Sequence, residues 1–137
     1  LFRVIFDNSR ETAQSALLTT FCEFLLVPGY LFTDSVKWEK TGERTVRGTL
    51  TDSGIRASAI FRFGDDGLLA SVETSDRYYT EGKGEYKKVK FSAVVDSYKR
   101  QGEIMIPEKM KAVWHLPGGN YEYFRGTISR IEYNVTE

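Results

Sequence analysis

Apolar residues recur at helical spacing in one stretch of the chain, residues 8–26. Its apolar positions fall three and four residues apart and include Ala13, Ala16, Leu17, Phe21, Phe24 and Leu25. Asn8 and Glu11 have the spacing of a capping box, so we place the start of the helix at Asn8. Pro28 ends it, because proline lacks an amide hydrogen and disfavours helix in the preceding residue. The pattern predicts one amphipathic helix with an almost wholly buried C-terminal end.

Most of the remaining chain alternates apolar and polar residues with the period of two that is typical of strands. The expected strands cover residues 1–6, 36–39, 44–51, 55–63, 68–75, 86–100, 103–106, 109–116 and 121–135, with a short turn at 30–32. The sequences DSG at residues 52–54 and GDDG at residues 64–67 are hairpin signals. The pattern predicts an α+β fold in which a curved, half-barrel-like antiparallel meander packs around one N-terminal helix, as a single domain over residues 1–137.

Small residues stand between larger ones along the faces of the strands that we expect to point inward. They are Gly48, Ala57, Ala59, Ala70, Ala93, Ala112 and Gly126. Stacked side by side, they would form a shallow trough that lets the helix approach the sheet closely. We also expect Trp38 to face inward from its strand.

The charge balance argues against a nucleic-acid partner. Nineteen Lys and Arg residues offset 19 Asp and Glu residues, and no element combines a basic cluster with aromatic residues, as nucleic-acid-binding surfaces do. The length of 137 residues and the hydrophobic content of 41% are enough for the core of one domain.

A single cysteine, Cys22, and a single histidine, His115, limit the chemistry. They exclude an internal disulfide and a Cys/His zinc site, and we expect no cofactor and no bound metal. We expect His115 to be an exposed or hydrogen-bonded strand residue rather than a general base. No apolar run is long enough to span a membrane. The compartment stays open, and cysteine usage favours the cytoplasm.

Several segments together resemble the C-terminal half of an uncharacterised bacterial family of unknown function. They are CEFLLVPGYLF, VKWE, FRFGDDGLL, DRYY and the closing run from YKRQGEIMIPEKMKAVWHL to RIEYN. The most specific parts are Trp38-Glu39, Arg77-Tyr78 and the order Gly102, Pro107, Trp114, Tyr123, Tyr133-Asn134. The resemblance implies that the chain is the C-terminal part of a longer protein, and it implies no particular activity.

The candidate ligand-binding residues are Glu23, Trp38, Glu39, Arg77, Tyr78, Trp114 and Tyr123. Glu23 lies in the apolar run FCEFLL, where an unpaired carboxylate would be costly to bury. We expect Arg77 to reach Glu23 across the core and to neutralise it; the alternative is that they form the polar floor of a ligand pocket. The tyrosines suit either cross-strand packing or contact with a ligand.

These features are compatible with three functions. The first is a non-catalytic binding module that holds an apolar or amphipathic ligand, such as a lipid, between helix and sheet, by analogy with half-barrel lipoprotein carriers. The second is a structural or interaction domain, completed by an N-terminal half or by a homodimer through exposed strand edges. The third is an enzyme that uses Glu23 or Glu39 with Arg77. Because no motif of a catalytic triad is present, we assign no catalytic residue.

Overall fold

The computed structural model describes residues 8–81 and 84–135 of the chain. Its helices and strands are α1 (Arg10–Glu23), the 3-10 helix η1 (Pro28–Phe32), β1 (Val36–Lys40), β2 (Thr45–Asp52), β3 (Ile55–Phe63), β4 (Leu69–Thr74), β5 (Tyr78–Tyr79), β6 (Lys87–Lys88), β7 (Phe91–Gln101), β8 (Ile104–Leu116) and β9 (Gly119–Thr127). The strand expected over residues 1–6 lies outside the described residues.

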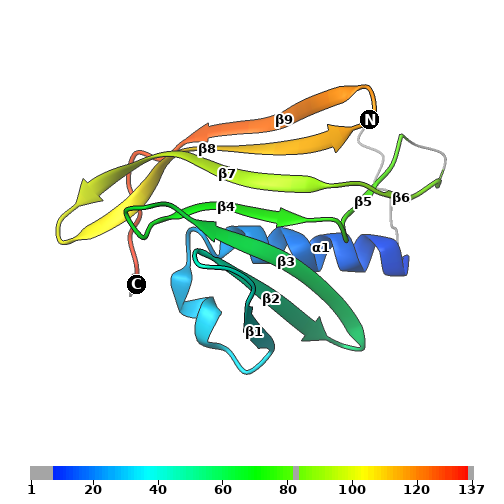
Figure 1. Cartoon of the computed structure of the whole chain (residues 1–137), viewed down its shortest axis with the longest axis horizontal. Helices are drawn as coiled ribbons and strands as arrows, with labels where there is room; N and C mark the ends of the chain where they lie inside the picture. Colours follow the sequence, from blue (N-terminus) through cyan, green and yellow to red (C-terminus); the bar gives the residue numbers. More distant parts are fainter. Residues whose placement is uncertain (1–7, 82–83, 136–137) are drawn as a thin grey trace.

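Seven strands form one antiparallel sheet with the order β1-β2-β3-β4-β7-β8-β9. The helix α1 packs on one face of this sheet, chiefly against β3 (Figure 1). The predicted α+β class with one helix on an antiparallel meander is confirmed. Within residues 8–81 and 84–135, β1 and β9 are the two edges, so the sheet is not closed into a barrel.

The turns that the sequence predicted lie between β2 and β3 and between β3 and β4. Ser53 and Gly54 have φ angles of 48° and 76°, and Gly67 has a φ angle of 77°. These left-handed conformations are the ones that tight hairpin turns require. The DSG and GDDG signals therefore mark real hairpins.

Three strand predictions differ from the structure. The strand β8 continues through Pro107, which was expected to end it; Pro107 lies opposite Tyr98, next to a register shift around Ser97, where a residue without an amide is tolerated. The segment 86–100, expected as one long strand or as two with a bend, divides into the short strand β6 and the long strand β7, and β6 pairs in a separate hairpin with β5, which was not predicted. The last strand ends at Thr127, because the chain beyond it bonds instead to the side chain of Gln101.

The helix begins later than predicted. Ser9 is its N-cap, with an extended backbone and a hydroxyl that accepts a hydrogen bond from the Thr12 amide at 3.1 Å. The prediction that Asn8 caps the helix is therefore wrong. Glu11 lies in the first turn, where its negative charge interacts favourably with the positive end of the helix dipole.

The buried face of α1 also differs from the predicted stripe. Leu18 and Phe21 are fully buried, as expected, but Ala13 and Ala16 are exposed. Glu23 is exposed too, so the predicted burial of the whole C-terminal end is wrong at that position. The helix is rotated relative to the predicted orientation, because it presents the polar residue Gln14 to the sheet.

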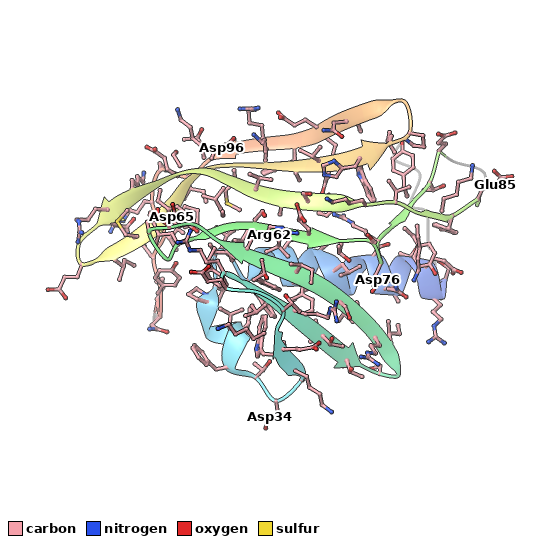
Figure 2. All side chains as sticks on the ribbon, viewed as in Figure 1. Asp34, Arg62, Asp65, Asp76, Glu85 and Asp96 are labelled. Carbon is pink, nitrogen blue, oxygen red and sulfur yellow. The ribbon has the colours of Figure 1, made fainter. Side chains whose placement is uncertain are left out.

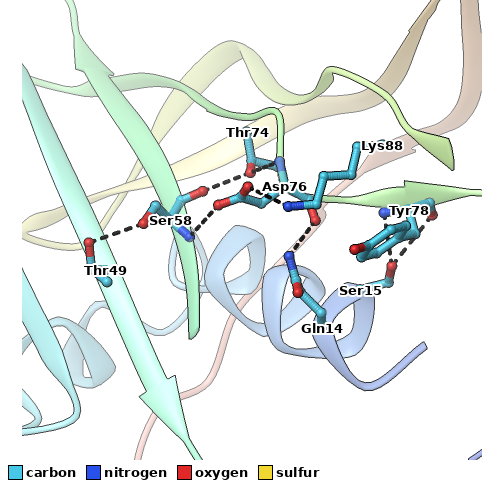
Figure 3. Close-up of polar contacts among 8 residues, drawn as sticks. All are labelled: Gln14, Ser15, Thr49, Ser58, Thr74, Asp76, Tyr78 and Lys88. Atoms are coloured by element: carbon cyan, nitrogen blue, oxygen red, sulfur yellow. Dashed lines mark hydrogen bonds and ion pairs between the residues drawn. The ribbon is translucent and has the colours of Figure 1, made fainter. Parts of the chain in front are cut away.

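Polar side chains anchor the N-terminal half of α1 to the ends of β3 and β4 (Figure 3). Gln14 is buried and donates a hydrogen bond from Nε2 to the Asp76 carbonyl at 2.8 Å. The Asp76 carboxylate accepts bonds from the Ser58 amide and from Lys88 Nζ, both at 3.2 Å. Ser15 Oγ accepts a bond from the amide of Tyr78 at 3.1 Å. These bonds satisfy groups that are partly removed from water and thereby fix the position of the helix.

An aromatic cluster joins the C-terminal half of α1 to β1, β2 and β3. The Phe21 ring lies 5.4 Å from that of Phe61 and 6.3 Å from that of Trp38, both in edge-to-face geometry. Gly48 lies beneath them: a Cβ there would be 2.7 Å from the Trp38 ring and 3.0 Å from Phe21. The absence of a side chain at Gly48 therefore permits this close packing.

The trough of small residues is present in most strands. Gly48, Ala57, Ala59, Ala93 and Ala112 are buried on the helix-facing side, and Gly126 is half-buried. Ala70 is exposed, so it does not belong to the trough. The pairing of β3 with β4 shifts between Arg62 and Phe63, and Leu69 packs against the core in place of the predicted residue.

Candidate functional site

A cavity of about 340 Å³ lies between the C-terminal half of α1 and the strands β7, β8 and β9. Its lining consists of Thr19, Cys22, Glu23 and Leu26 from the helix and the turn after it, Arg77, and the sheet residues Phe91, Ala93, Met110, Lys111, Ala112, Tyr123, Phe124, Gly126, Thr127 and Ile128. We call this cavity the Arg77 pocket. Most of the exposed surface in it is carbon.

The pocket exists because α1 packs against β3 and leaves part of the sheet uncovered. In Figure 1, β8 and β9 extend beyond the helix on one side. Small residues occupy this part: Ala93 lies opposite Ala112, and Gly126 lies opposite Met110. Longer side chains at these positions would fill the space beside the helix.

Arg77 lies between β4 and β5 and reaches the wall of the pocket. The central carbon of its guanidinium is 4.0 Å from the centre of the Phe91 ring, 5.0 Å from that of Trp114 and 5.8 Å from that of Tyr123. Each ring belongs to a different strand, and each lies within the distance at which an aromatic face attracts a cation. The three rings therefore hold the cation in one orientation.

The hydrogen-bonding capacity of Arg77 is only partly used. Nη1 donates to the Tyr123 hydroxyl at 3.4 Å, which is a long bond, and Nε is buried without a partner. A guanidinium carries five N–H donors, and leaving a buried one unpaired costs free energy. The arrangement favours a further acceptor in the pocket.

The predicted ion pair between Arg77 and Glu23 does not form. Glu23 is exposed on the helix, and among the described residues no carboxylate lies within 4.0 Å of the Arg77 guanidinium. Lys111, the other cation in the lining, is paired with Asp96 at 2.6 Å. Within residues 8–81 and 84–135, the Arg77 cation is thus not neutralised by a carboxylate.

Some other carboxylates are paired with other cations or lie at the outer edges of the molecule. Glu73, on β4, pairs with Arg62 at 3.0 Å. Asp34 and Glu85 lie at the outer edges in Figure 2. The pocket therefore combines the Arg77 cation with an apolar wall, and Glu23 is the carboxylate in its lining.

Cys22 lines the pocket as a neutral thiol. Burial raises the pKa of Cys22 from 9.0 to about 12; nearby Arg77 lowers it and Glu23 raises it further. A thiol with this pKa is protonated at physiological pH and is a poor nucleophile. Cys22 therefore forms part of the apolar wall of the pocket and is not expected to form covalent bonds with a ligand.

The structure brings together four of the seven candidate residues. Glu23, Arg77 and Tyr123 line the pocket, and Trp114 stacks beside Arg77. The others lie elsewhere. Glu39 pairs with Arg47 on the opposite face of the sheet, at 3.2 Å.

Trp38 and Tyr78 have structural contacts away from the pocket. The Trp38 indole donates a hydrogen bond to the Leu31 carbonyl at 3.0 Å and thereby ties β1 to η1. Tyr78 bonds to Ser15 of the helix through its backbone. A site that combines Glu39 with Arg77 is not supported, because the two side chains line different pockets.

A second apolar cavity, of about 440 Å³, lies at the other side of the C-terminal end of α1. We call it the Trp38 pocket. Its lining includes Leu31, Phe32, Trp38, Phe63, Tyr98, Met105 and Tyr133, and it contains no charged side chain. Phe32 is 88% exposed at its rim.

The sequence did not reveal the partners of His115. Its Nε2 lies 2.7 Å from Ser92 Oγ, and its Nδ1 lies 3.0 Å from Asn120 Oδ1. Ser92 is 3% exposed, on a continuous sheet whose amides are used in strand pairing. The bonds confirm a hydrogen-bonded strand histidine, and the three residues bridge β7, β8 and the start of β9. Their positions 23 and five residues apart carry no motif that could have predicted the contact.

Neither a metal-ligand cluster nor a membrane-spanning helix is found among residues 8–81 and 84–135. Among the described residues, no group of three or more His, Cys, Asp or Glu side chains could hold a metal ion. In the same part of the chain, no helix has the length and hydropathy needed to cross a membrane.

Comparison with known proteins identifies the family. No curated protein and no solved structure matches the chain. A family model covers nearly all of it, which confirms the resemblance to an uncharacterised family. Since the match extends over residues 1–133, the chain belongs to a family of unknown function (DUF6920).

Proposed function

We propose that this chain is a non-catalytic binding module that holds a small apolar or amphipathic ligand in the Arg77 pocket. The observation that carries the proposal is a cavity with apolar walls beside a cation that has no carboxylate partner among the described residues. A ligand in this space would make contacts with the apolar walls that the protein leaves unmade.

The size and lining of the pocket support a small ligand. Its volume of about 340 Å³ is near the lower end of the range of roughly 300–1,000 Å³ that ligand pockets occupy. Leu26, Met110, Phe124 and Ile128 supply apolar contacts, and Thr19 and Thr127 lie in the lining as polar groups. A few polar groups in an otherwise apolar wall are typical of sites that orient their ligand.

Saturable binding of Nile red, a neutral apolar dye, tests the proposal. We expect its fluorescence to rise to a plateau at one dye per chain. Ala112→Leu places a larger side chain in the pocket. If the leucine side chain removes the contacts of about two methylene-sized groups of the dye, at ~0.8 kcal/mol each, the dye binds roughly tenfold more weakly.

Ala70→Leu is the matched control, because Ala70 is an exposed alanine on β4, outside the pocket lining. It makes the same chemical change, and we expect it to bind the dye as the wild type does. Absence of saturable binding to the wild type would contradict the proposal. Equal binding by Ala112→Leu and Ala70→Leu would place the dye outside the Arg77 pocket and contradict it too.

A second candidate, homodimerisation, is favoured by the edge strand β9. Tyr121, Tyr123 and Phe124 on this strand are 52%, 44% and 53% exposed. An edge strand with exposed aromatic residues can pair with a second copy. Light scattering tests this candidate: a concentration-dependent dimer that Tyr121→Lys disrupts is expected, and a monomer at all concentrations contradicts it.

A further inference from the structure

The charge of Arg77 specifies the ligand further, on the assumption that the proposed function is correct. We infer that the ligand is a single-chain amphipathic carboxylate whose head group pairs with Arg77 and whose tail runs toward Met110 and Ile128. The inference rests on the charges of the pocket and on the direction in which its lining changes from cationic to apolar.

The pocket offers one free positive charge. Arg77 has no ion pair in the part of the chain that the structure describes, whereas Lys111 is held by Asp96 at 2.6 Å. Glu23 lies at the exposed rim, where water screens its charge. One cation matches a head group with one negative charge, and a guanidinium matches the planar geometry of a carboxylate. A doubly charged phosphate would leave one charge unpaired.

The aromatic residues prepare Arg77 for this role. Phe91, Trp114 and Tyr123 contact the cation through their rings, which contribute no formal negative charge. The side chain is held in place before a ligand arrives, so less conformational entropy is lost on binding. The Tyr123 hydroxyl lies beside the guanidinium, and as a donor it could bond to the same head group.

The strand register gives the direction of the tail. Trp114, which stacks on Arg77, is four residues from Met110 on β8. At ~3.4 Å per residue, Trp114 and Met110 lie roughly 14 Å apart along β8. Met110 lies opposite Gly126, and Ile128 follows β9 at the same end. No charged side chain except the paired Lys111 stands between the two ends on β8. A medium-length alkyl chain fits this path.

Displacement of Nile red by decanoic acid and by decanol tests the inference, since the two ligands differ only in the head group. At a pH where the acid is ionised, we expect the wild type to bind it about tenfold to hundredfold more tightly than the alcohol, as a hydrogen bond to a charged group implies. In Arg77→Gln we expect the two ligands to bind equally.

Two further variants separate charge from folding. Arg77→Lys retains the charge and is expected to keep a preference for the acid, which would tie the loss of preference in Arg77→Gln to the lost charge. Lys109→Gln removes an exposed cation of β8 outside the pocket lining and is expected to keep the full preference. Equal binding of decanoic acid and decanol to the wild type would overturn the inference and leave the proposed function standing. Failure of both, and of Nile red, would overturn the proposed function itself.

Discussion

Replacing Gly48 by alanine tests the packing that brings α1 onto the sheet. The added Cβ would lie 2.7 Å from Cζ3 of Trp38 and 3.0 Å from Cζ of Phe21. Phe21 is fully buried, with the rings of Phe24 and Phe61 within 5.4 Å, so it has no room to retreat. Trp38 is 39% exposed and can move outward only by weakening its contact with Phe61 at 4.9 Å.

The expected loss of stability combines two opposing effects. Overpacking of a core costs about 1–3 kcal/mol. Replacing glycine within a strand restores about 0.5–1 kcal/mol, because alanine loses less conformational entropy on folding. We therefore expect Gly48→Ala to lower the free energy of unfolding by about 1–2 kcal/mol. With a denaturant dependence of about 2 kcal/mol per molar urea, the midpoint falls by roughly 0.5–1 M.

Urea unfolding followed by tryptophan fluorescence measures this difference. Gly118→Ala is the control, because a Cβ at Gly118 meets no atom within 4 Å; its stability should stay within about 0.5 kcal/mol of the wild type. In a Trp38→Leu background, Gly48→Ala should lower the free energy of unfolding by less, because the nearest ring atoms are absent. A Gly48→Ala protein as stable as Gly118→Ala would refute the close approach of helix and sheet.

Three other predictions test separate parts of the structure. Cys22 should react with iodoacetamide about a thousandfold more slowly near neutral pH than a thiol of pKa 9.0, because its pKa is raised to about 12. The stability that the protein gains from keeping this thiol neutral is complete below pH 9.0 and is lost as the pH rises toward 12. Rapid alkylation of the folded protein would contradict this. Asp76→Ala should lower the free energy of unfolding by about 1–3 kcal/mol, since the Ser58 amide loses its acceptor, and Asp76→Asn should cost less; equal melting temperatures would contradict the anchoring role. Glu23→Gln should leave stability unchanged within about 0.5 kcal/mol, since Glu23 is exposed. A large loss of stability would instead support the predicted ion pair between Glu23 and Arg77.

The sequence predicted the sheet well because its signals are local. The DSG and GDDG turns depend on residues that adopt positive φ angles, as Ser53, Gly54 and Gly67 do. Alternation along each strand identified the helix-facing residues of β2, β3 and β7. Register shifts are the exception: Ala70 was misplaced because the irregular pairing of β3 with β4 is a property of two strands together.

The orientation of the helix could not be predicted, because it depends on a distant residue. Gln14 is polar and lies outside the predicted apolar stripe, yet it is buried because the Asp76 carbonyl, 62 residues away, accepts its hydrogen bond. This contact rotates α1, so that Ala13 and Ala16 become exposed. No feature within residues 8–26 encodes it.

The candidate site was only partly predictable, because it too depends on contacts between residues that are distant in the sequence. Arg77 and Tyr123 were selected from the sequence, and both line the pocket. The partner assigned to Arg77 was wrong, because the aromatic rings from β7, β8 and β9 replace the expected carboxylate. The pocket itself depends on the helix packing against β3 rather than against the centre of the sheet.

The two methionines provide the most direct test of the ligand site. Met110 lines the Arg77 pocket and Met105 lines the Trp38 pocket. NMR spectra of protein with isotope-labelled methionine methyl groups, assigned with Met→Leu variants, report on both pockets at once. On titration with decanol, we predict that the Met110 signal shifts to saturation while the Met105 signal stays in place. A shift of Met105 alone, or of neither signal, would contradict the account.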